Sequence, residues 1–198
     1  MKSKQRQSRQ RPRLDRATII EAAIARIERY GLEELSARKL AQDLGCEAMS
    51  LYHHVKSMEA LKDSIVDHLL ATVVPAERAP SLETVRGFAE AYLDLATRYA
   101  RSFQLVATRR WTGTNAVDAA SRVVASFQAI GFDHREALVR ARALAAYLNG
   151  AGLALTAWIT DESAPATEAR RVRADLHRGL NLLFRSLAAS EPAPQQGR

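Results

Sequence analysis

The stretch Ser36–Leu61 reads SARKLAQDLGCEAMSLYHHVKSMEAL and decides the fold of the N-terminal part of the chain. Its serine is an expected N-cap for the helix ARKLAQDL, and Gly45 is placed to end that helix. Leu51 and Val55 stand four residues apart in the segment AMSLYHHV, so a second short helix would bury both on one side. Two short helices joined by a tight turn with a glycine predict a helix-turn-helix.

A longer amphipathic helix is predicted just upstream, between Asp15 as N-cap and Gly31 as C-cap. Its charged residues, including Arg26, fall on the side opposite the apolar ones. Three helices of roughly fifteen, eight and eight residues would then share one small core within residues 14–56. The apolar residues of the first helix recur at spacings of three and four: Ile19, Ile20, Ala23, Ile24, Ile27 and Tyr30.

This core determines which side of the segment AMSLYHHV meets solvent. If Leu51 and Val55 are buried, Tyr52 and His53 lie on the outer surface. An outward helix of this kind suits the DNA major groove, which admits one α-helix. A metal bound by His53 and His54 together is disfavoured, because neighbouring helical residues point about 100° apart.

The formal net charge of +7 is concentrated in the N-terminal part of the chain. Residues 1–56 hold twelve Lys and Arg against seven Asp and Glu, whereas residues 57–198 hold seventeen against fifteen. Residues 1–13 contain almost nothing apolar, so we expect a disordered basic tail there. The charge distribution predicts a polyanionic partner, although a tail that merely aids solubility fits the same pattern.

Beyond Pro75 and Pro80 the chain is predicted to be helical almost to its end. Alanine and leucine abound and no alternating strand pattern occurs, which favours an all-α protein. We expect a connecting helix over 57–72, a larger helical bundle over 73–189 and a disordered tail over 190–198. Helical spacing marks five segments of the bundle: Leu82–Tyr99, Arg101–Trp111, Asn115–Ile130, Arg135–Ile159 and Thr167–Leu187.

The run ATIIEAAIARIERYGLEELSARKLAQDLGCEAMSLYHHVKSMEAL resembles the DNA-binding head of the tetracycline-repressor (TetR) family. The likeness covers about residues 14–72 and is closest to the tetracycline repressors within that family, whereas the bundle resembles them only faintly. It implies a helix-turn-helix head on a helical regulatory and dimerisation domain, and a dimer that represses by occupying a palindromic operator. The matching positions are Ala41, Gly45, Leu51, Tyr52, Val55, Lys56 and Leu61.

Nine residues of the head are candidates for contact with DNA. Phosphate contacts are expected from Thr18, Arg38, Tyr52, His54 and Lys56. Base contacts are expected from Arg38, whose planar fork suits guanine, and from Ala48, Met49, Ser50 and His53. The resemblance implies DNA-facing positions for all of these except Thr18. Ala48, Met49 and His53 replace a glutamine, a proline and a tryptophan of the tetracycline repressors, which implies a different operator sequence.

The resemblance also implies a small-molecule effector in the bundle that alters the separation of the two heads. Leu105 stands where the tetracycline repressors have a drug- and magnesium-binding histidine, so neither that drug nor a metal is implied. The run Arg109–Trp111 fits a cation–π cluster, a linker to the head or part of the effector site. Candidate pocket residues, each of which also fits an ordinary core position, are Phe88, Tyr92, Phe103, Trp111, Phe127, Tyr147, Asn149 and Trp158.

A single head makes few contacts with DNA, so we expect a homodimer whose heads lie one turn of the duplex apart. The last two long helices carry apolar stripes that can form the dimer interface, although both stripes also fit an intrachain core. The candidates are Leu138, Ala141, Leu144, Ala145, Leu148 and Gly152 on the first of these helices, and Leu176, Leu180, Leu183, Phe184 and Leu187 on the second.

No catalytic or cofactor-binding pattern stands out in the sequence. Ser/His/Asp orderings, glycine-rich phosphate loops and metal-spaced Cys/His sets are absent, so we expect neither an enzyme nor a cofactor. Cys46 is the only cysteine and no apolar window is long enough for a membrane span, which favours the cytoplasm. The sequence predicts a ligand-responsive repressor. The alternatives are a nonspecific DNA-packaging protein and a small-molecule-binding helical protein without operator specificity.

Overall fold

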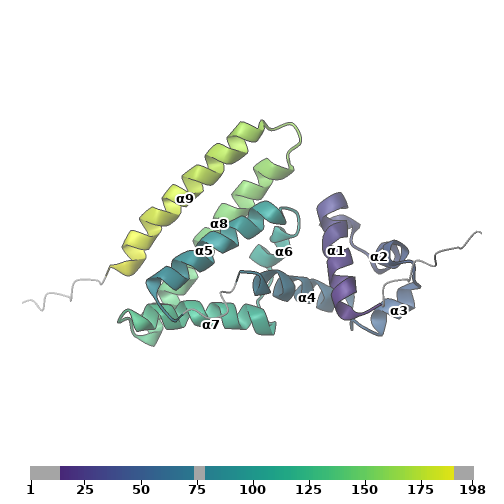
Figure 1. Cartoon of the computed structure of the whole chain (residues 1–198), viewed down its shortest axis with the longest axis horizontal. Helices are drawn as coiled ribbons and strands as arrows, with labels where there is room; N and C mark the ends of the chain where they lie inside the picture. Colours follow the sequence, from purple (N-terminus) through teal and green to yellow (C-terminus); the bar gives the residue numbers. More distant parts are fainter. Residues whose placement is uncertain (1–13, 74–78, 190–198) are drawn as a thin grey trace, which may run out of the picture. The chain divides into compact units, whose positions relative to one another are not determined.

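The computed structural model describes residues 14–73 and 79–189, which form nine α-helices, one short 3₁₀ helix and no strand (Figure 1). The all-α fold expected from the sequence is therefore confirmed. The tails expected over 1–13 and 190–198 lie outside the described residues. The Cα positions divide the chain into two compact units, and the division falls between Leu61 and Lys62, inside a helix.

The first unit begins its helices where the sequence predicts them. The Asp15 carboxylate accepts a hydrogen bond from the Thr18 amide at 2.8 Å, and the Ser36 hydroxyl accepts one from the Lys39 amide at 3.4 Å. Gly45 ends α2 with a φ of 64°, in the left-handed region that favours glycine. The elements are α1 (Arg16–Tyr30), η1 (Leu32–Glu34), α2 (Ala37–Leu44), α3 (Ala48–Tyr52) and the first residues of α4 (Met58–Ala71).

One side of each helix forms the core of this unit, in which α2 packs against both α1 and α3. Full burial of each large aliphatic side chain stabilises the fold by about 1.5–3 kcal/mol. Tyr30 does not join this core. It is exposed, with the guanidinium groups of Arg26 and Arg29 within 5.1 Å of its ring centre. The core residues are Ile19, Ile20, Ala23, Ile24, Ile27, Leu35, Leu40, Ala41, Leu51, Val55 and Leu61.

The helix α3 is shorter than the sequence predicts, because it ends at Tyr52 rather than at Val55. The amides of His54 and Val55 both donate to the Leu51 carbonyl at 2.9 Å, so the chain leaves the helix through a tight turn. Val55 is nevertheless buried, because the turn returns its side chain to the core.

Arg26 also differs from the prediction, which places it on the solvent side of α1. Its side chain is only 10% exposed. The Nε atom donates to the Glu34 carbonyl at 2.9 Å, and Nη1 donates to the Asp43 carboxylate at 2.5 Å. Arg26 therefore fastens α1 to η1 and to α2, so that the position of α2 depends on a charged side chain as well as on the apolar core.

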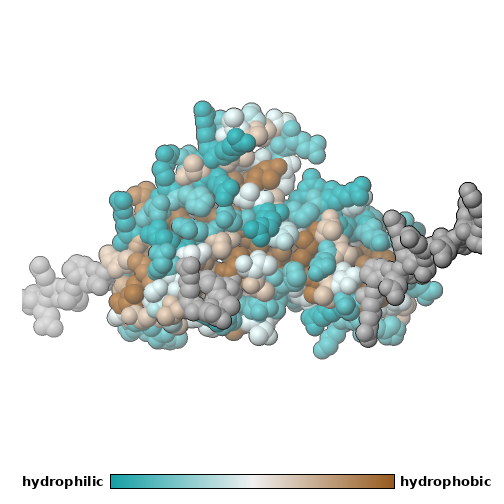
Figure 2. Space-filling view, in the orientation of Figure 1, coloured by the Kyte–Doolittle hydropathy of each residue, from teal (hydrophilic) through white to brown (hydrophobic). Residues whose placement is uncertain are grey.

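The second unit is a helical bundle built around α8, against which α5, α6, α7 and α9 all pack. Among the described helices, α8 alone is long and apolar enough to cross a membrane by length and composition, and about a third of that apolar stretch is buried inside the protein. The visible surface over α9 is mostly hydrophilic (Figure 2). The helices are α5 (Leu82–Arg98), α6 (Phe103–Thr108), α7 (Thr114–Ala129), α8 (His134–Thr160) and α9 (Ala166–Ala188).

Only α6 departs strongly from the predicted segments of the bundle, since it ends at Thr108 instead of continuing to Trp111. Arg109 takes an extended backbone, and the indole N–H of Trp111 donates to the Val106 carbonyl at 3.0 Å. This bond folds the loop back toward α6. Trp111 is thereby held in a loop between α6 and α7 rather than on a helix.

Candidate functional sites

Burial and exposure along α3 follow the predicted pattern. The side chains of Leu51 and Val55 are 1% and 5% exposed, whereas Met49 is 69% and Tyr52 is 42% exposed. His53 is exposed as well, in the turn that follows the helix. The flank of α3 expected to meet DNA is therefore turned away from the core of its own unit.

All nine residues predicted to contact DNA lie outside the buried core of the head. They come from the first turns of α1 and α2, from α3, and from the turn after α3. The set contains two permanent cations and no acid, which suits a surface that meets phosphates. Arg38, Met49, Tyr52, His53, His54 and Lys56 are exposed, and Thr18, Ala48 and Ser50 are half-buried.

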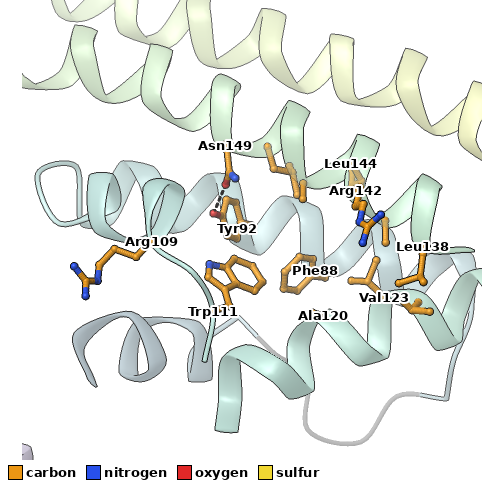
Figure 3. A pocket seen from close by; sticks show the side chains of 14 residues that line it. Phe88, Tyr92, Arg109, Trp111, Ala120, Val123, Leu138, Arg142, Leu144 and Asn149 are labelled. Atoms are coloured by element: carbon orange, nitrogen blue, oxygen red, sulfur yellow. Dashed lines mark hydrogen bonds between the residues drawn. The ribbon is translucent and has the colours of Figure 1, made fainter. Parts of the chain in front are cut away.

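A cavity of about 370 Å³ lies within the second unit (Figure 3). Its size falls in the range of small-molecule sites, about 300–1,000 Å³. Phe88 and Tyr92 come from α5 and Trp111 from the loop after α6, and their rings lie between α7 and α8 in this view. The lining from α7 and α8 is mostly aliphatic: Ala120, Val123, Val124, Leu138, Ala141, Leu144, Ala145 and Leu148, with Arg142 and Asn149 as polar members.

Tyr92 and Asn149 form a polar contact in the cavity wall. The Tyr92 hydroxyl donates to the Asn149 Oδ1 atom at 2.6 Å (Figure 3). Burial raises the pKa of the Tyr92 hydroxyl above its usual value. The hydroxyl therefore keeps its proton at neutral pH and acts as the donor. The bond fixes the side-chain amide of Asn149 with its oxygen toward the tyrosine.

Arg109 lines the cavity, but its guanidinium turns toward α4. Its Nε and Nη2 atoms donate to the Asp63 Oδ1 atom at 2.9 and 2.6 Å. In Figure 3 this side chain points away from the rings of Trp111, Tyr92 and Phe88. Of the roles left open for Arg109–Trp111, the structure supports a cavity wall that is fastened to α4.

A second contact joins α4 to the far side of the same loop. The Asp67 carboxylate accepts hydrogen bonds from the Ala116 amide at 3.0 Å and from the Asn115 side chain at 3.1 Å, at the start of α7. A Cβ atom on Gly113 would lie 2.2 Å from Asp67 Oδ1, so only glycine fits there without movement. The loop that carries Trp111 is thus held to α4 on both sides.

Four of the eight residues predicted for an effector site line this cavity, namely Phe88, Tyr92, Trp111 and Asn149. The other four lie elsewhere and do not form its wall. Phe103 and Phe127 are fully buried in the core, Tyr147 donates to the Leu176 carbonyl at 2.6 Å, and Trp158 is exposed. Arg142 is missing from the prediction, because a lone arginine on a long helix carries no signal in the sequence.

Six of the residues predicted for a dimer interface are buried inside their own chain: Leu144, Leu148, Gly152, Leu180, Phe184 and Leu187. Leu138, Ala141 and Ala145 line the cavity, and Leu176 and Leu183 are half-buried. The stripe chosen on α8 therefore faces the interior of the bundle, where it packs against neighbouring helices and borders the cavity. Ala145, in the same stripe, is exposed. The residues of the dimer interface stay a prediction.

Within the described ranges, no group of three or more His, Cys, Asp or Glu residues is arranged to hold a metal ion. His53 and His54 lie together in the turn after α3, exposed to solvent. Cys46 is half-buried in the turn between α2 and α3.

No family model matches the chain, but its sequence is similar to those of several transcriptional regulators. An HTH-type transcriptional regulator of Saccharopolyspora erythraea is 29% identical over 191 residues, which cover 96% of this chain and 80% of that protein. The class D tetracycline repressor of Escherichia coli is 44% identical over 59 residues, 30% of this chain and 27% of that protein. The chain belongs to the TetR family of transcriptional regulators.

The fold agrees with that of solved TetR-family structures. A TetR variant from Acinetobacter baumannii AYE, crystallised in complex with minocycline, has a TM-score of 0.73 at 25% identity, covering 89% of this chain and 99% of that chain. The stronger match to the tetracycline repressor falls on the N-terminal head. Membership of the TetR family therefore rests on both units, whereas the closest sequence agreement lies in the unit that contains the helix-turn-helix.

Proposed function

We propose that this TetR-family protein is a repressor that binds a palindromic operator as a homodimer and releases it when a small molecule occupies the cavity. We propose further that it acts in the cytoplasm and is neither an enzyme nor a metalloprotein. Residues 14–56 would bind DNA, 57–72 would connect, and 73–189 would hold the effector and form the dimer. The observation that supports this function best is the division of α3 and its following turn, where Leu51 and Val55 are buried while Tyr52 and His53 are exposed.

On the operator, α3 would enter the major groove with its first residues toward the base edges. Met49 and Ser50 stand at this end of the helix, and the exposed thioether of Met49 suits an apolar contact with a thymine methyl. Tyr52 and Lys56 follow on the exposed flank, where hydroxyl and ammonium groups can bind phosphates. Affinity would then fall steeply as the salt concentration rises. The logarithm of the binding constant should fall linearly with the logarithm of the salt concentration, with a slope of roughly −0.9 for each phosphate that the protein neutralises.

The dimer would use the side of α8 that faces away from the cavity. Val139, which is 56% exposed, begins a stripe of apolar and small residues at alternating spacings of four and three. This spacing is typical of two helices that pack along their length. On α9, Leu182 is 65% exposed, so most of its apolar side chain could pack against a second copy. The stripe on α8 consists of Val139, Ala143, Ala146, Gly150, Leu153 and Ala157.

The proposed function is tested by selecting bound sites from random duplexes with the full chain, and then by competing the selected site against bulk DNA at one fixed salt concentration. We expect near-palindromic sites and a specificity ratio of about 10³ or more, as is typical of operator-binding proteins. A ratio near one would contradict the proposal and favour a DNA-packaging protein. A selected site without twofold symmetry would contradict the dimer.

Tyr52→Ala and Met49→Ala should separate affinity from specificity. Tyr52→Ala is expected to weaken binding by roughly 1–2 kcal/mol per head on every sequence, because a phosphate contact carries no sequence information. Met49→Ala should instead change which base is preferred at one position of each half-site, with little effect on bulk DNA. Affinities for a panel of single-base operator variants measure both effects. If the two variants shift every site equally, this division of roles is wrong.

An effector in the cavity would act on the head through α4. Trp111 lies in the cavity wall, and its loop is joined to α4 by the Arg109–Asp63 ion pair and by the hydrogen bonds to Asp67. The residues of α4 from Met58 to Leu61 belong to the head, so α4 is the chain segment that both units share. Release requires that the effector bind more tightly when α4 takes the position that disfavours DNA.

Asp67→Ala is expected to uncouple the two sites while leaving the cavity intact. A cavity ligand should bind within about twofold of the original affinity, but its effect on operator affinity should fall at least fivefold, within the usual range of coupling energies. Asp67→Asn keeps an acceptor for the Ala116 amide and should retain coupling. Asp118→Ala removes an α7 carboxylate whose ion pair stays within that helix, so it is the matched control. Unchanged coupling in Asp67→Ala would contradict this route.

A further inference from the structure

We infer that the cavity takes a flat aromatic molecule with an anionic oxygen group at one end and a neutral hydrogen-bond acceptor at the other. This inference rests on the proposed function, because it names the chemical class of effector for the same cavity. Three features of the lining support it: the aromatic wall, the balance of charge, and the spacing of two donors along α8.

The aromatic wall offers flat surfaces rather than hydrogen-bonding groups. The ring centre of Tyr92 lies 5.9 Å from that of Phe88 and 6.0 Å from that of Trp111, and both pairs are tilted by about 40°. The Trp111 indole N–H and the Tyr92 hydroxyl are both engaged with protein acceptors. Tyr92 is 1% and Phe88 is 6% exposed, so the ring surface open to a ligand is mainly that of the half-buried Trp111, on which an aromatic group packs favourably.

The charge of the lining favours an anion. The cavity wall contains two arginines and no aspartate or glutamate. The guanidinium of Arg109 is matched by the Asp63 carboxylate. Arg142, on α8, has no ion-pair or hydrogen-bond partner among the described residues. A cationic ligand would meet this group with no compensating acid in the wall, whereas a carboxylate or phenolate would pair with it.

A second donor lies two helical turns further along α8. Because Tyr92 holds the Asn149 oxygen, the NH₂ group of Asn149 is the part of the amide without a partner among the described residues. Asn149 and Arg142 are seven residues apart on one helix and both line the cavity, so their α-carbons are separated by roughly 10 Å. A ligand about the length of a biphenyl, with an anion at one end and an acceptor at the other, fits this pair of donors.

The test compares three probes that share one aromatic body: 4′-methoxybiphenyl-4-carboxylate, the corresponding neutral 4-methanol, and the corresponding 4-methylammonium. Each is titrated calorimetrically into the full-length protein without DNA. The carboxylate should bind about tenfold more tightly than the alcohol, and the ammonium more weakly than both. In a Trp158→Phe background, Trp111 is the only tryptophan left. A shift of its indole N–H resonance in the proton NMR spectrum then reports that the probe has entered the cavity.

Arg142→Gln should reduce the preference for the carboxylate to within about twofold of the alcohol. Arg135→Gln is the matched control, because Arg135 is an exposed arginine of the same helix that does not line the cavity. Equal binding of all three probes, a preference kept in Arg142→Gln, an unmoved Trp111 resonance or no binding at all would each overturn the inference. Since these titrations contain no operator, a failure of operator binding would be seen separately and would count against the proposed function alone.

Discussion

Leu51→Ala is expected to lower the free energy of unfolding of the head by about 2–5 kcal/mol. Leu51 is 1% exposed and belongs to a core shared by α1, α2 and α3. A unit that ends at Leu61 buries little apolar surface, and domains of this size are marginally stable. The loss should therefore leave a large share of heads unfolded at physiological temperature and weaken operator binding at least about tenfold.

Hydrogen exchange followed by mass spectrometry locates this effect. Amides of α1 and α2 should lose protection in Leu51→Ala, while those of α8, in the second unit, should keep it. Met49→Ala truncates a neighbouring residue of α3 that is 69% exposed, and the stability of the head should change by no more than about 0.5 kcal/mol. Equal loss of protection in the two variants would show that α3 is not anchored by its buried side.

The sequence predicted the start of each head helix correctly because those signals are local. Asp15 and Ser36 hydrogen-bond to amides three residues ahead, and Gly45 supplies the backbone angle that ends α2. The end of α3 and the burial of Arg26 were predicted wrongly, since both depend on partners outside the local pattern. A spacing of four between Leu51 and Val55 is satisfied equally by a continuous helix and by a helix followed by a turn.

The bundle was less predictable, because α8 carries apolar residues around much of its circumference. One stripe, which includes Leu144 and Leu148, packs inside the protomer and borders the cavity, while another, beginning at Val139, faces solvent. Helical periodicity finds both stripes and does not tell which one meets a neighbouring helix. The same limit applies to the aromatic residues: Phe88 and Phe103 both fit a buried helical side, and only the packing of the bundle places the first at the cavity and the second behind it.

Gly152→Ala is expected to destabilise the bundle, although alanine is the better helix former. A Cβ atom at Gly152 would lie 2.3 Å from the Cε1 and Cζ atoms of Phe103. That ring is fully buried and packs edge-on against Tyr92, with ring centres 5.3 Å apart, so it has little room to move. Overpacking of this kind costs about 1–3 kcal/mol, more than the ~1 kcal/mol that alanine gains over glycine within a helix. We expect a lower Tm by thermal denaturation, together with weaker binding of any cavity ligand, because displacing Phe103 disturbs Tyr92.

The same substitution in a Phe103→Leu background isolates the cause. Leucine removes the ring atoms that the new methyl group meets, so in that background Gly152→Ala should cost little or should stabilise the bundle by up to about 1 kcal/mol. The four proteins form a double-mutant cycle whose coupling energy measures the contact between positions 103 and 152. An equal cost of Gly152→Ala in both backgrounds would mean that α8 and α6 do not approach each other at this point. In that case any loss of stability in Gly152→Ala would have to come from a cause other than a clash with the Phe103 ring.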